Sequence, residues 1–491
     1  HGCPVCIGMP GSLPVLNRKV VEYAIKAGLA LNCEISTFSV MDRKNYFYPD
    51  LPKAYQISQL YRPLCQNGYI EIDTNEGIKR IGIKEIHMEE DAGKLVHDEH
   101  DGRFSFVDYN RCGVPLIEIV TNPDFRTAEE VKTFLEKLKA ILQFAGVSDC
   151  KMQEGSLRVD VNVSVRPKSE TELGTRTEIK NLNSFKAIIR AIDSEAKRQI
   201  QIIKSGGKVM QETRRWDDTK GASYGMRSKE EAHDYRYFPE PDLVPVVVDQ
   251  SRLDEIKASM PEMPDARKKR YITEYGLPEY DAWMLTSSKA LSDFFESAVK
   301  ESINHKTVSV IKVADDCKDT DNVSSMSNCK GMDNDGGMNS CKDTDYGGNT
   351  NIYKSISNWI MGDLIRILKE KNMEPEEIPF SGRDLAKMVQ LIDTGRITGT
   401  IAKKVFELMF ETGKDPEAII KEENLEVLSD TDELMSVIKS VIESNVKSVE
   451  DYKAGKNKAM GFLVGQVMKK TGGKADPKLV NKLLAEELSK A

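Results

Sequence analysis

The spacing of apolar residues predicts helices and strands mixed together in the first half of the chain. The clearest helix covers residues 127–145, where apolar side chains recur every three or four positions. Thr127 and Glu130 open this run in the pattern of a capping box, and Gly146 ends it. We therefore expect a long amphipathic helix in this segment.

A strand with one polar face is predicted over residues 157–165, where Leu and Val alternate strictly with polar residues. The polar positions include Arg158, Asp160 and Asn162. A second alternating stretch, 176–180, follows a turn-forming glycine. Together the two stretches predict a hairpin whose polar face carries charges of both signs.

Strand patterns fade after about residue 250, and helical periodicity replaces them. The segments with helical spacing are 353–370, 383–411, 432–444 and 477–490. The fold class predicted from these patterns is α+β, with a mixed-sheet N-terminal part followed by small helical bundles.

Residues 313–352 interrupt this organisation with three tandem 12-residue units. The units begin at Cys317, Cys329 and Cys341, and each starts Cys-Lys and carries an Asp at its fifth position. The repeated Cys and Asp residues suggest a metal site. The segment has almost no apolar residues to bury, however, and this favours a repeat expansion without a packed core.

Composition narrows the class of protein without identifying it. The 491 residues include 70 Lys and Arg against 78 Asp and Glu, which gives a net charge of −8. At roughly 150 residues per domain, the length suggests about three domains. No apolar run is long enough for a transmembrane helix. The nine scattered cysteines suit a reducing compartment better than a disulfide scaffold.

Two acidic positions differ from their surroundings. Glu118 lies inside an apolar run. If its carboxylate is buried there, it needs a charged partner or a metal ion. The alternative is simple strand alternation, which places Glu118 on a solvent-exposed face. Glu89 and Glu90 follow His87 and precede Lys94 at the end of an alternating stretch. Carboxylates in this setting suit a Mg²⁺–phosphate site, and a charged surface turn is the alternative.

Two loops, 42–50 and 234–242, mix aromatic, basic and acidic residues around proline and contain Lys44 and Arg236. Such loops suit stacking and hydrogen bonding to a nucleotide or a tRNA end, and aromatic-anchored structural turns are the alternative.

Two further features suggest ligands. Cys3 and Cys6 form a CxxC pair, which is half of a zinc site and needs two more ligands. Residues 447–490 hold ten lysines and five acidic residues, so this tail is locally positive and suits phosphate contacts, with a solvated helical surface as the alternative.

These motifs resemble the B-subunit family of the aspartyl/glutamyl-tRNA amidotransferases. The resemblance covers nearly everything outside 305–352, and its blocks follow in the family's order. The blocks that carry it include "DRKNYFYPDLPKAYQISQ", "HMEEDAGK", "PLIEIVTNPD", "MQEGSLRVDVNVSVRP", "EIKNLNSF", "DYRYFPEPDL", "SNWIMGDL" and "YKAGKNKAMGFLVGQVMK".

The resemblance implies an α+β cradle domain, a helical domain and a small helical tail of YqeY-like type. Its expected boundaries are a catalytic cradle at 1–250, a helical domain at 251–304 and 353–424, the repeat insertion at 305–352, and a tRNA-binding tail at 425–491.

The implied reaction uses ATP and Mg²⁺ to phosphorylate the side-chain carboxylate of Glu on tRNA(Gln) or Asp on tRNA(Asn). Ammonia then displaces phosphate, so the enzyme class is a carbon–nitrogen ligase with glutamine as amido donor. The implied partners in a heterotrimer are the A subunit, which is a glutaminase, together with the C subunit. The tRNA is a further implied partner, and a membrane is not. The implied location is a bacterial-type cytoplasm, with an organelle left open.

The resemblance also assigns site residues. The Mg²⁺ glutamates of the family match Glu89, Glu90 and Glu118. By inference from their positions, we add to the catalytic group Arg158 and Asp160, and to the ATP-binding group Lys44, Lys94, Asn162 and Arg236. The expected zinc half site is Cys3 and Cys6, and the expected tRNA-binding lysines are Lys453, Lys456 and Lys458.

One departure from the family bears on activity. Family members begin with a strand whose Glu and His complete the metal site, and the present sequence starts after that stretch. We expect a shortened form of an active subunit. The alternatives are a free-standing ATP-dependent carboxylate–amine ligase and a non-catalytic tRNA-binding or assembly subunit.

Overall fold

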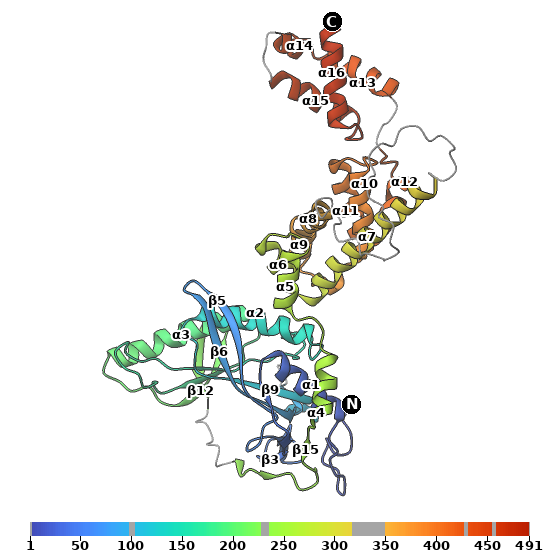
Figure 1. The fold of residues 1–491 in the computed structure, drawn as a ribbon. Helices are drawn as coiled ribbons and strands as arrows, with labels where there is room; N and C mark the ends of the chain where they lie inside the picture. Colours follow the sequence, from blue (N-terminus) through green and yellow to red (C-terminus); the bar gives the residue numbers. More distant parts are fainter. Residues whose placement is uncertain are drawn as a thin grey trace, which may run out of the picture. The chain divides into compact units, whose positions relative to one another are not determined.

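The computed structural model describes residues 2–97, 104–226, 235–316, 349–426, 431–453 and 458–490 (Figure 1). The chain divides into two compact units, His1–Ala266 and Arg267–Ala491. The first unit contains all the described strands, whereas the second is helical, so the predicted α+β class is confirmed. The three Cys-containing repeat units lie outside the described residues.

Two four-stranded sheets dominate the first unit. One is antiparallel and has the order β1-β5-β6-β9, with the bounds Glu34–Ile35, Cys65–Thr74, Gly77–Glu90 and Pro115–Thr121. The other has the order β10-β11-β12-β13, with the bounds Val161–Val163, Thr177–Lys180, Glu212–Asp217 and Ala222–Gly225. Its two central strands, β11 and β12, run parallel, so this sheet is mixed.

Smaller sheets complete the described strands of this unit. A three-stranded sheet has the order β14-β3-β4, with the bounds Phe238–Pro239, Asp42–Asn45 and Tyr55–Ser58. Two pairs are β15-β2, at Val246–Val247 and Phe38–Ser39, and β7-β8, at Lys94–His97 and Ser105–Asp108.

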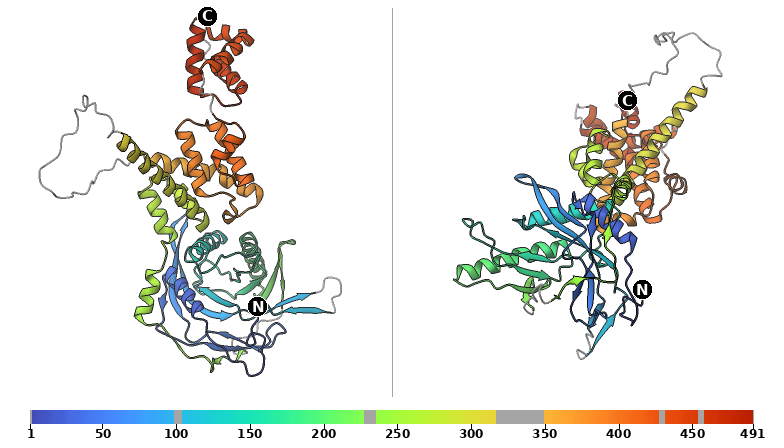
Figure 2. Two further views of the ribbon diagram at one scale, coloured as in Figure 1. Left: turned by 90° about the vertical axis from the view of Figure 1, so that its right-hand side faces the viewer. Right: turned by 60° about the horizontal axis from the view of Figure 1, so that its bottom comes forward.

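Helices pack on the two large sheets and on one another. Their bounds are α1 Arg18–Ala30, α2 Ala128–Phe144, α3 Phe185–Lys204 and α4 Gln250–Ala258. Helix α2 packs on β5, α3 packs on β10 and β13, and α2 and α3 lie side by side, as Figure 2 shows. One apolar core therefore joins both sheets, with Ile81, Phe134, Ile188 and Trp216 among its most buried side chains.

The first unit extends beyond the boundary expected at residue 250. Helix α4 belongs to it, because Ile256 is 2% exposed and Leu253 packs against the same core. The unit consequently ends at Ala266, and the second unit begins at Arg267.

The long helix expected at 127–145 is confirmed as α2. Thr127 caps it by accepting a hydrogen bond from the Glu130 backbone N–H at 3.2 Å. The reciprocal bond of the capping box is displaced by one residue, because the Glu130 carboxylate accepts from the backbone N–H of Arg126 at 2.7 Å.

The predicted hairpin is present but shorter than its alternating sequence. Strands β10 and β11 pair antiparallel, with Val161 opposite Ile179. Asn181 has a φ of 67°, which turns the chain out of β11 before it could pair with the residues ahead of Val161. Arg158, Asp160 and Asn162 are nevertheless all exposed, as the alternation predicts.

The described residues of the second unit form two apolar cores, one within 271–425 and one within 434–488. The helices of the first core and its approach are α5 Pro264–Thr273, α6 Glu279–Leu285, α7 Lys289–Asp316, α8 Asn349–Trp359, a π-helical turn Ile360–Leu364, α9 Ile365–Lys371, a 3₁₀ turn Pro375–Glu377, α10 Gly382–Asp393, α11 Gly399–Thr412 and α12 Pro416–Glu422. Those of the tail are α13 Thr431–Ser444, α14 Val446–Lys453, α15 Lys458–Lys470 and α16 Pro477–Lys490.

These helices follow the sequence pattern with one break. The stretch 383–411 forms two helices, because Gly395 adopts a φ of 73° and Thr398 caps a new helix. The stretch 353–370 is helical throughout, with a π-helical turn in its middle. Within the described ranges, no helix is long and apolar enough to cross a membrane.

Candidate functional site

Strand β6 changes its core-facing side halfway along, and this change creates the candidate site. In the first half of the strand the odd-numbered residues Ile81 and Ile83 are buried. In the second half the even-numbered residues Ile86 and Met88 are buried instead. The register with β9 shifts between Ile83 and Glu85, as in a β-bulge. Beyond the bulge, the odd-numbered residues therefore point away from the Ile86 and Met88 face.

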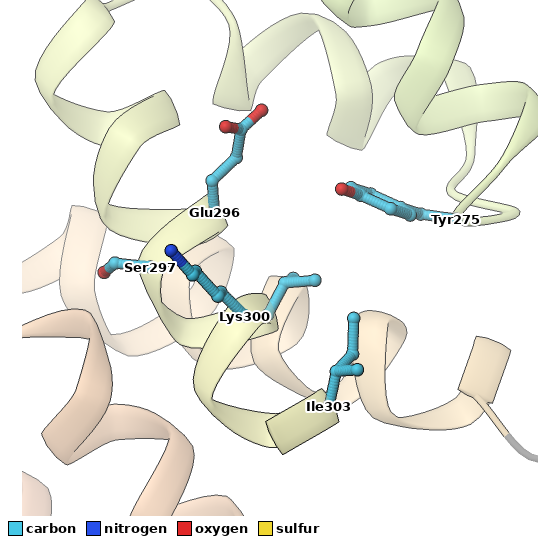
Figure 3. Close-up of a pocket in the computed structure, with 6 residues that line it drawn as sticks. Tyr275, Glu296, Ser297, Lys300 and Ile303 are labelled. Atoms are coloured by element: carbon cyan, nitrogen blue, oxygen red, sulfur yellow. The ribbon is translucent and has the colours of Figure 1, made fainter. Parts of the chain in front are cut away.

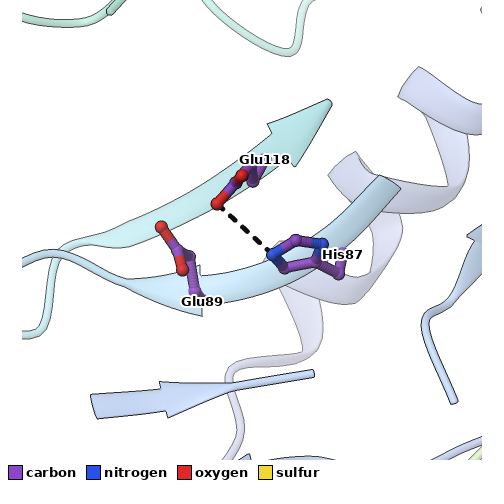
Figure 4. Close-up of side chains that lie close together, drawn as sticks. All are labelled: His87, Glu89 and Glu118. Carbon is purple, nitrogen blue, oxygen red and sulfur yellow. Dashed lines mark ion pairs between the residues drawn. The ribbon is translucent and has the colours of Figure 1, made fainter. Parts of the chain in front are cut away.

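His87, Glu89 and Glu118 meet on that other face of β6 and β9. His87 lies directly opposite Glu118 in the antiparallel pair, and Glu89 is the diagonal neighbour of Glu118. The His87 Nε2 atom is 3.4 Å from Oε2 of Glu118 (Figure 4). One potential ligand atom from each of the three residues lies within 4.8 Å of the others.

The electrostatics of these three residues suit an additional positive charge. Burial opposes protonation of His87, but the carboxylates of Glu118, Glu89 and Glu85 outweigh it and raise its pKa. Burial and the neighbouring Glu118 raise the pKa of Glu89, whereas the bond to His87 lowers the pKa of Glu118. Two carboxylates this close repel one another unless a cation lies between them.

The donor set fits a divalent cation. Two carboxylates are the hard oxygen ligands that Mg²⁺ and Mn²⁺ prefer, and the imidazole of His87 beside Glu118 can orient one of them. His87 Nδ1 is buried and has no hydrogen-bond partner among the described residues, and the nearby Glu85 Oε1 is 3.8 Å away. The face thus offers more acceptor and donor capacity than this part of the protein satisfies.

Glu90 lies on the opposite face of β6 from Glu89. Its carboxylate forms an ion pair with Lys53 and accepts from the Ile57 backbone N–H at 3.0 Å. The resemblance implied that Glu90 lies together with Glu89 and Glu118. The structure does not bring it there, and His87 takes the third position in the cluster. The reason is the two-residue period of the strand, which separates neighbours onto opposite faces.

The polar face of the hairpin supplies charged groups near the cluster. Arg158 forms an ion pair with Asp91 at 2.6 Å, just beyond the end of β6. Asp160 forms an ion pair with Lys180 at 2.8 Å, and the charge of Lys180 contributes to lowering the pKa of Glu118. Asn162 is exposed on the same strand face as Asp160.

The two aromatic loops meet at Lys44. Its Nζ atom lies 5.5 Å from the ring centre of Tyr46 and 4.9 Å from that of Tyr235, so residues far apart in sequence surround one ammonium group. The charge of Lys44 also acts on Glu89 and Glu118. Arg236 is exposed with a φ of 42°, and its carbonyl accepts from the Asn45 side chain at 2.8 Å.

The remaining predicted residues lie elsewhere. Lys94 is exposed at the start of β7. Cys3 and Cys6 share an N-terminal turn with their Sγ atoms 3.2 Å apart. Lys458 is exposed at the start of α15, Lys453 ends α14, and Lys456 lies outside the described residues.

Sequence reasoning did not select His87 and Lys180 as site residues. The signal for His87 was its position two residues before Glu89, which places both on one strand face. Lys180 lies two residues after Glu178, which pairs with Asn162, and this spacing directs it toward Asp160. Predicting either contact requires the register, which the sequence pattern leaves open.

Two cavities lie apart from this cluster. One of about 310 Å³ belongs to the helical unit, where Tyr275 lies across from Glu296 and Lys300 (Figure 3). Its Glu296 is already held by Arg270 and by the Tyr271 hydroxyl at 3.1 Å. The other, of about 540 Å³, lies in the first unit and is lined by residues of α1, α2, α4 and β5. Neither is lined by His87, Glu89 or Glu118.

Comparison with known proteins points to one family. Residues 1–254 match the family model described as the GatB/GatE catalytic domain, and residues 345–488 match the one described as the GatB domain. The B subunit of the aspartyl/glutamyl-tRNA(Asn/Gln) amidotransferase of Caldicellulosiruptor bescii is 58% identical, covering 100% of this chain and 92% of that relative. The B subunits of Caldicellulosiruptor saccharolyticus and Thermoanaerobacter sp. are 57% and 56% identical, covering all of this chain and 92% and 93% of those relatives.

Proposed function

The chain belongs to the family of aspartyl/glutamyl-tRNA(Asn/Gln) amidotransferase B subunits, and we propose that it carries the kinase and amidation site of such an enzyme. The substrates are ATP, glutamine-derived ammonia, and Glu on tRNA(Gln) or Asp on tRNA(Asn). The observation that carries the proposal is the group His87, Glu89 and Glu118, which lies in the matched catalytic domain. The charges of Lys44 and Lys180 act on its carboxylates.

The reaction requires neutralisation of negative charge more than a nucleophile from the protein, because the carboxylate of the substrate's aminoacyl group is itself the nucleophile. Its carboxylate oxygen bonds to the γ-phosphorus of ATP, the bond to the β–γ bridging oxygen breaks, and ADP leaves. Ammonia then bonds to the acyl carbon, phosphate leaves with the C–O electron pair, and the nitrogen loses a proton. Both steps bring several anionic oxygens together.

Glu89 and Glu118 would hold the divalent cation, and His87 would orient Glu118. A bound Mg²⁺ supplies positive charge against the phosphate oxygens. Lys44 acts on both carboxylates from the aromatic loops, and Lys180 acts on Glu118 from the hairpin. These ammonium groups would hold the anionic ends of ATP and of the aminoacyl side chain, while Arg158 orders the end of β6 through Asp91.

The proposed partners in a heterotrimer are a glutaminase, as the A subunit, together with a C subunit, and the proposed location is a bacterial-type cytoplasm. The names of the relatives support the amidotransferase assignment. Zinc at Cys3 and Cys6 is a further proposal, because these two thiols supply half of a four-ligand set.

The decisive experiment follows ADP formation by the heterotrimer with Glu-tRNA(Gln) or Asp-tRNA(Asn) and no glutamine. We expect tRNA-dependent ADP formation that Glu89→Gln removes, while Glu71→Gln, on an exposed position of the same sheet, keeps it. Assembly and tRNA retention without ADP formation would identify a binding subunit. ADP formation with free glutamate and no tRNA would identify a free-standing ligase.

A further inference from the structure

The end of β6 that carries the cluster is a free edge within its own sheet. Strand β5 pairs with β6 only as far as Ile86, so residues 87–90 have β9 on one side and, among the residues that the structure describes, no sheet partner on the other. Past the last ladder position, which pairs Glu90 with Pro115, the Asp91 N–H donates to the Val114 carbonyl at 2.8 Å, so bonding on the β9 side continues beyond the end of β6. On the other side, the Met88 N–H and the Glu90 carbonyl receive no bond from β5 and need other partners.

Side chains of β4 and of the residues on either side of it bond to this free edge, although β4 belongs to a different sheet. The Gln59 side-chain carbonyl accepts from the Met88 N–H at 3.0 Å, and the Gln56 amide donates to the Glu90 carbonyl at 2.7 Å. The Glu90 carboxylate completes the set by accepting from Lys53 and from the Ile57 N–H. These bonds replace the missing strand.

The Lys53–Glu90 pair is shielded from solvent. The two side chains are only 7% and 14% exposed. The turn with Cys3 and Cys6 packs over this region, because a Cβ on Gly113 would lie 2.2 Å from Cys6 Sγ and 3.8 Å from Glu90 Oε2. A shielded pair interacts more strongly than a surface pair, and removing one partner leaves an uncompensated charge.

We infer that Glu90 is a positioning residue: with Lys53 it fixes the end of β6 and so sets the spacing of Glu89 and Glu118, and it does not itself hold the divalent cation. This inference rests on the proposed cation site at His87, Glu89 and Glu118. It separates two adjacent glutamates that the sequence alone assigns to the same role.

The test is a titration of the heterotrimer with Mn²⁺ as the probe, followed by electron paramagnetic resonance, with Glu89→Gln defining the signal of this site. We expect Lys53→Met and Glu90→Gln each to weaken Mn²⁺ binding by about 10- to 100-fold. The double variant should be no weaker than either single variant, because both remove the same contact. Lys53→Arg keeps the charge and should restore much of the affinity.

The sign of the Lys53→Met effect discriminates between the two roles. If Glu90 were a ligand, loss of Lys53 would release its carboxylate and tighten Mn²⁺ binding, which would overturn the inference. Unchanged binding in Lys53→Met would do the same. A wild-type heterotrimer without Mn²⁺ binding, or binding that Glu89→Gln leaves intact, would instead overturn the proposed cation site itself.

Lys79→Met is the matched control for a loosened strand. Lys79 joins the other end of β6 to α2 through an ion pair with Glu130 at 2.9 Å. Its loss should reduce the stability of the first unit to urea and leave Mn²⁺ affinity unchanged. An equal loss of Mn²⁺ affinity in Lys79→Met would show general loosening of the sheet and would also overturn the inference.

Discussion

At the scale of single residues, the site depends on which strand face each side chain occupies. His87 and Glu89 share a face with Glu118, whereas Glu90 is on the other face with Lys53. Composition does not distinguish the two glutamates, and neither does their position in the motif. Their contacts do, and they predict different consequences for the same Glu→Gln change.

His87 should act mainly by orienting Glu118, to which its Nε2 atom is close. We expect His87→Ala to reduce tRNA-dependent ADP formation by about 10- to 100-fold, as for other residues that orient a metal ligand. His87→Gln should recover part of the rate, because a side-chain amide can also donate a hydrogen bond to Glu118. Equal activity of His87→Ala and the wild type would contradict this role.

At the scale of elements, a buried network fastens α3 to the second large sheet. The Glu195 side chain is fully buried and is paired with Arg198 at 2.7 Å, and Gln199 donates to it at 2.7 Å. Burial alone would raise the pKa of Glu195, but Arg198 and Gln199 outweigh it and lower that pKa. The folded state therefore favours ionised Glu195.

This direction fixes how the network contributes to stability with pH. The contribution is present above the pKa of an unfolded glutamate, about 4.3, and is lost as the pH falls below it. Glu195→Gln should destabilise the first unit at pH 7 by on the order of 3 kcal/mol, with a smaller difference from the wild type near pH 3. Urea unfolding followed by fluorescence of the buried Trp216 measures both values. A difference in the free energy of unfolding between variant and wild type that stays constant with pH would contradict this prediction.

The end of the hairpin gives a second prediction at this scale. Asn181 ends β11 with a φ of 67°, and its side chain donates to the Trp216 carbonyl at 2.9 Å. Asn181→Ala should cost about 1–2 kcal/mol from the left-handed backbone alone, measured by urea unfolding. Asn181→Gly should cost less, because glycine adopts this conformation readily. Equal losses would show that the side-chain bond, rather than the backbone, decides the effect.

These elements show what the sequence pattern can and cannot predict. Periodicity predicted α2, the hairpin and the C-terminal helices, because each depends on local spacing. It could not locate the bulge between Ile83 and Glu85, which reverses the parity of β6 and decides that His87 joins the cluster. Bulges and strand ends depend on the partner strand, and a single sequence does not reveal its register.

At the scale of the whole molecule, the net charge of −8 conceals a basic tail. Lys458 and Lys469 are exposed at the two ends of α15, and the exposed Phe462 lies between them in the same helix. This combination of cations with an exposed ring suits contacts to an RNA backbone and its bases. The helices around the other core of the second unit, within 271–425, also carry exposed lysines, but Lys414 there is paired with Glu422 at 2.7 Å.

Lys458→Ala and Lys469→Ala should therefore weaken tRNA binding by the heterotrimer in a salt-dependent way. Each substitution that removes a phosphate contact should reduce the slope of log affinity against log salt by about 1, because fewer counterions are released. Filter binding of Glu-tRNA(Gln) across a salt series measures the slope, and Lys414→Ala is the matched control that should leave it unchanged. If the tail variants lower affinity without changing the slope, the lysines support the tail structure instead of contacting phosphates. Because the tail has its own core, its thermal unfolding in the same variants distinguishes these outcomes.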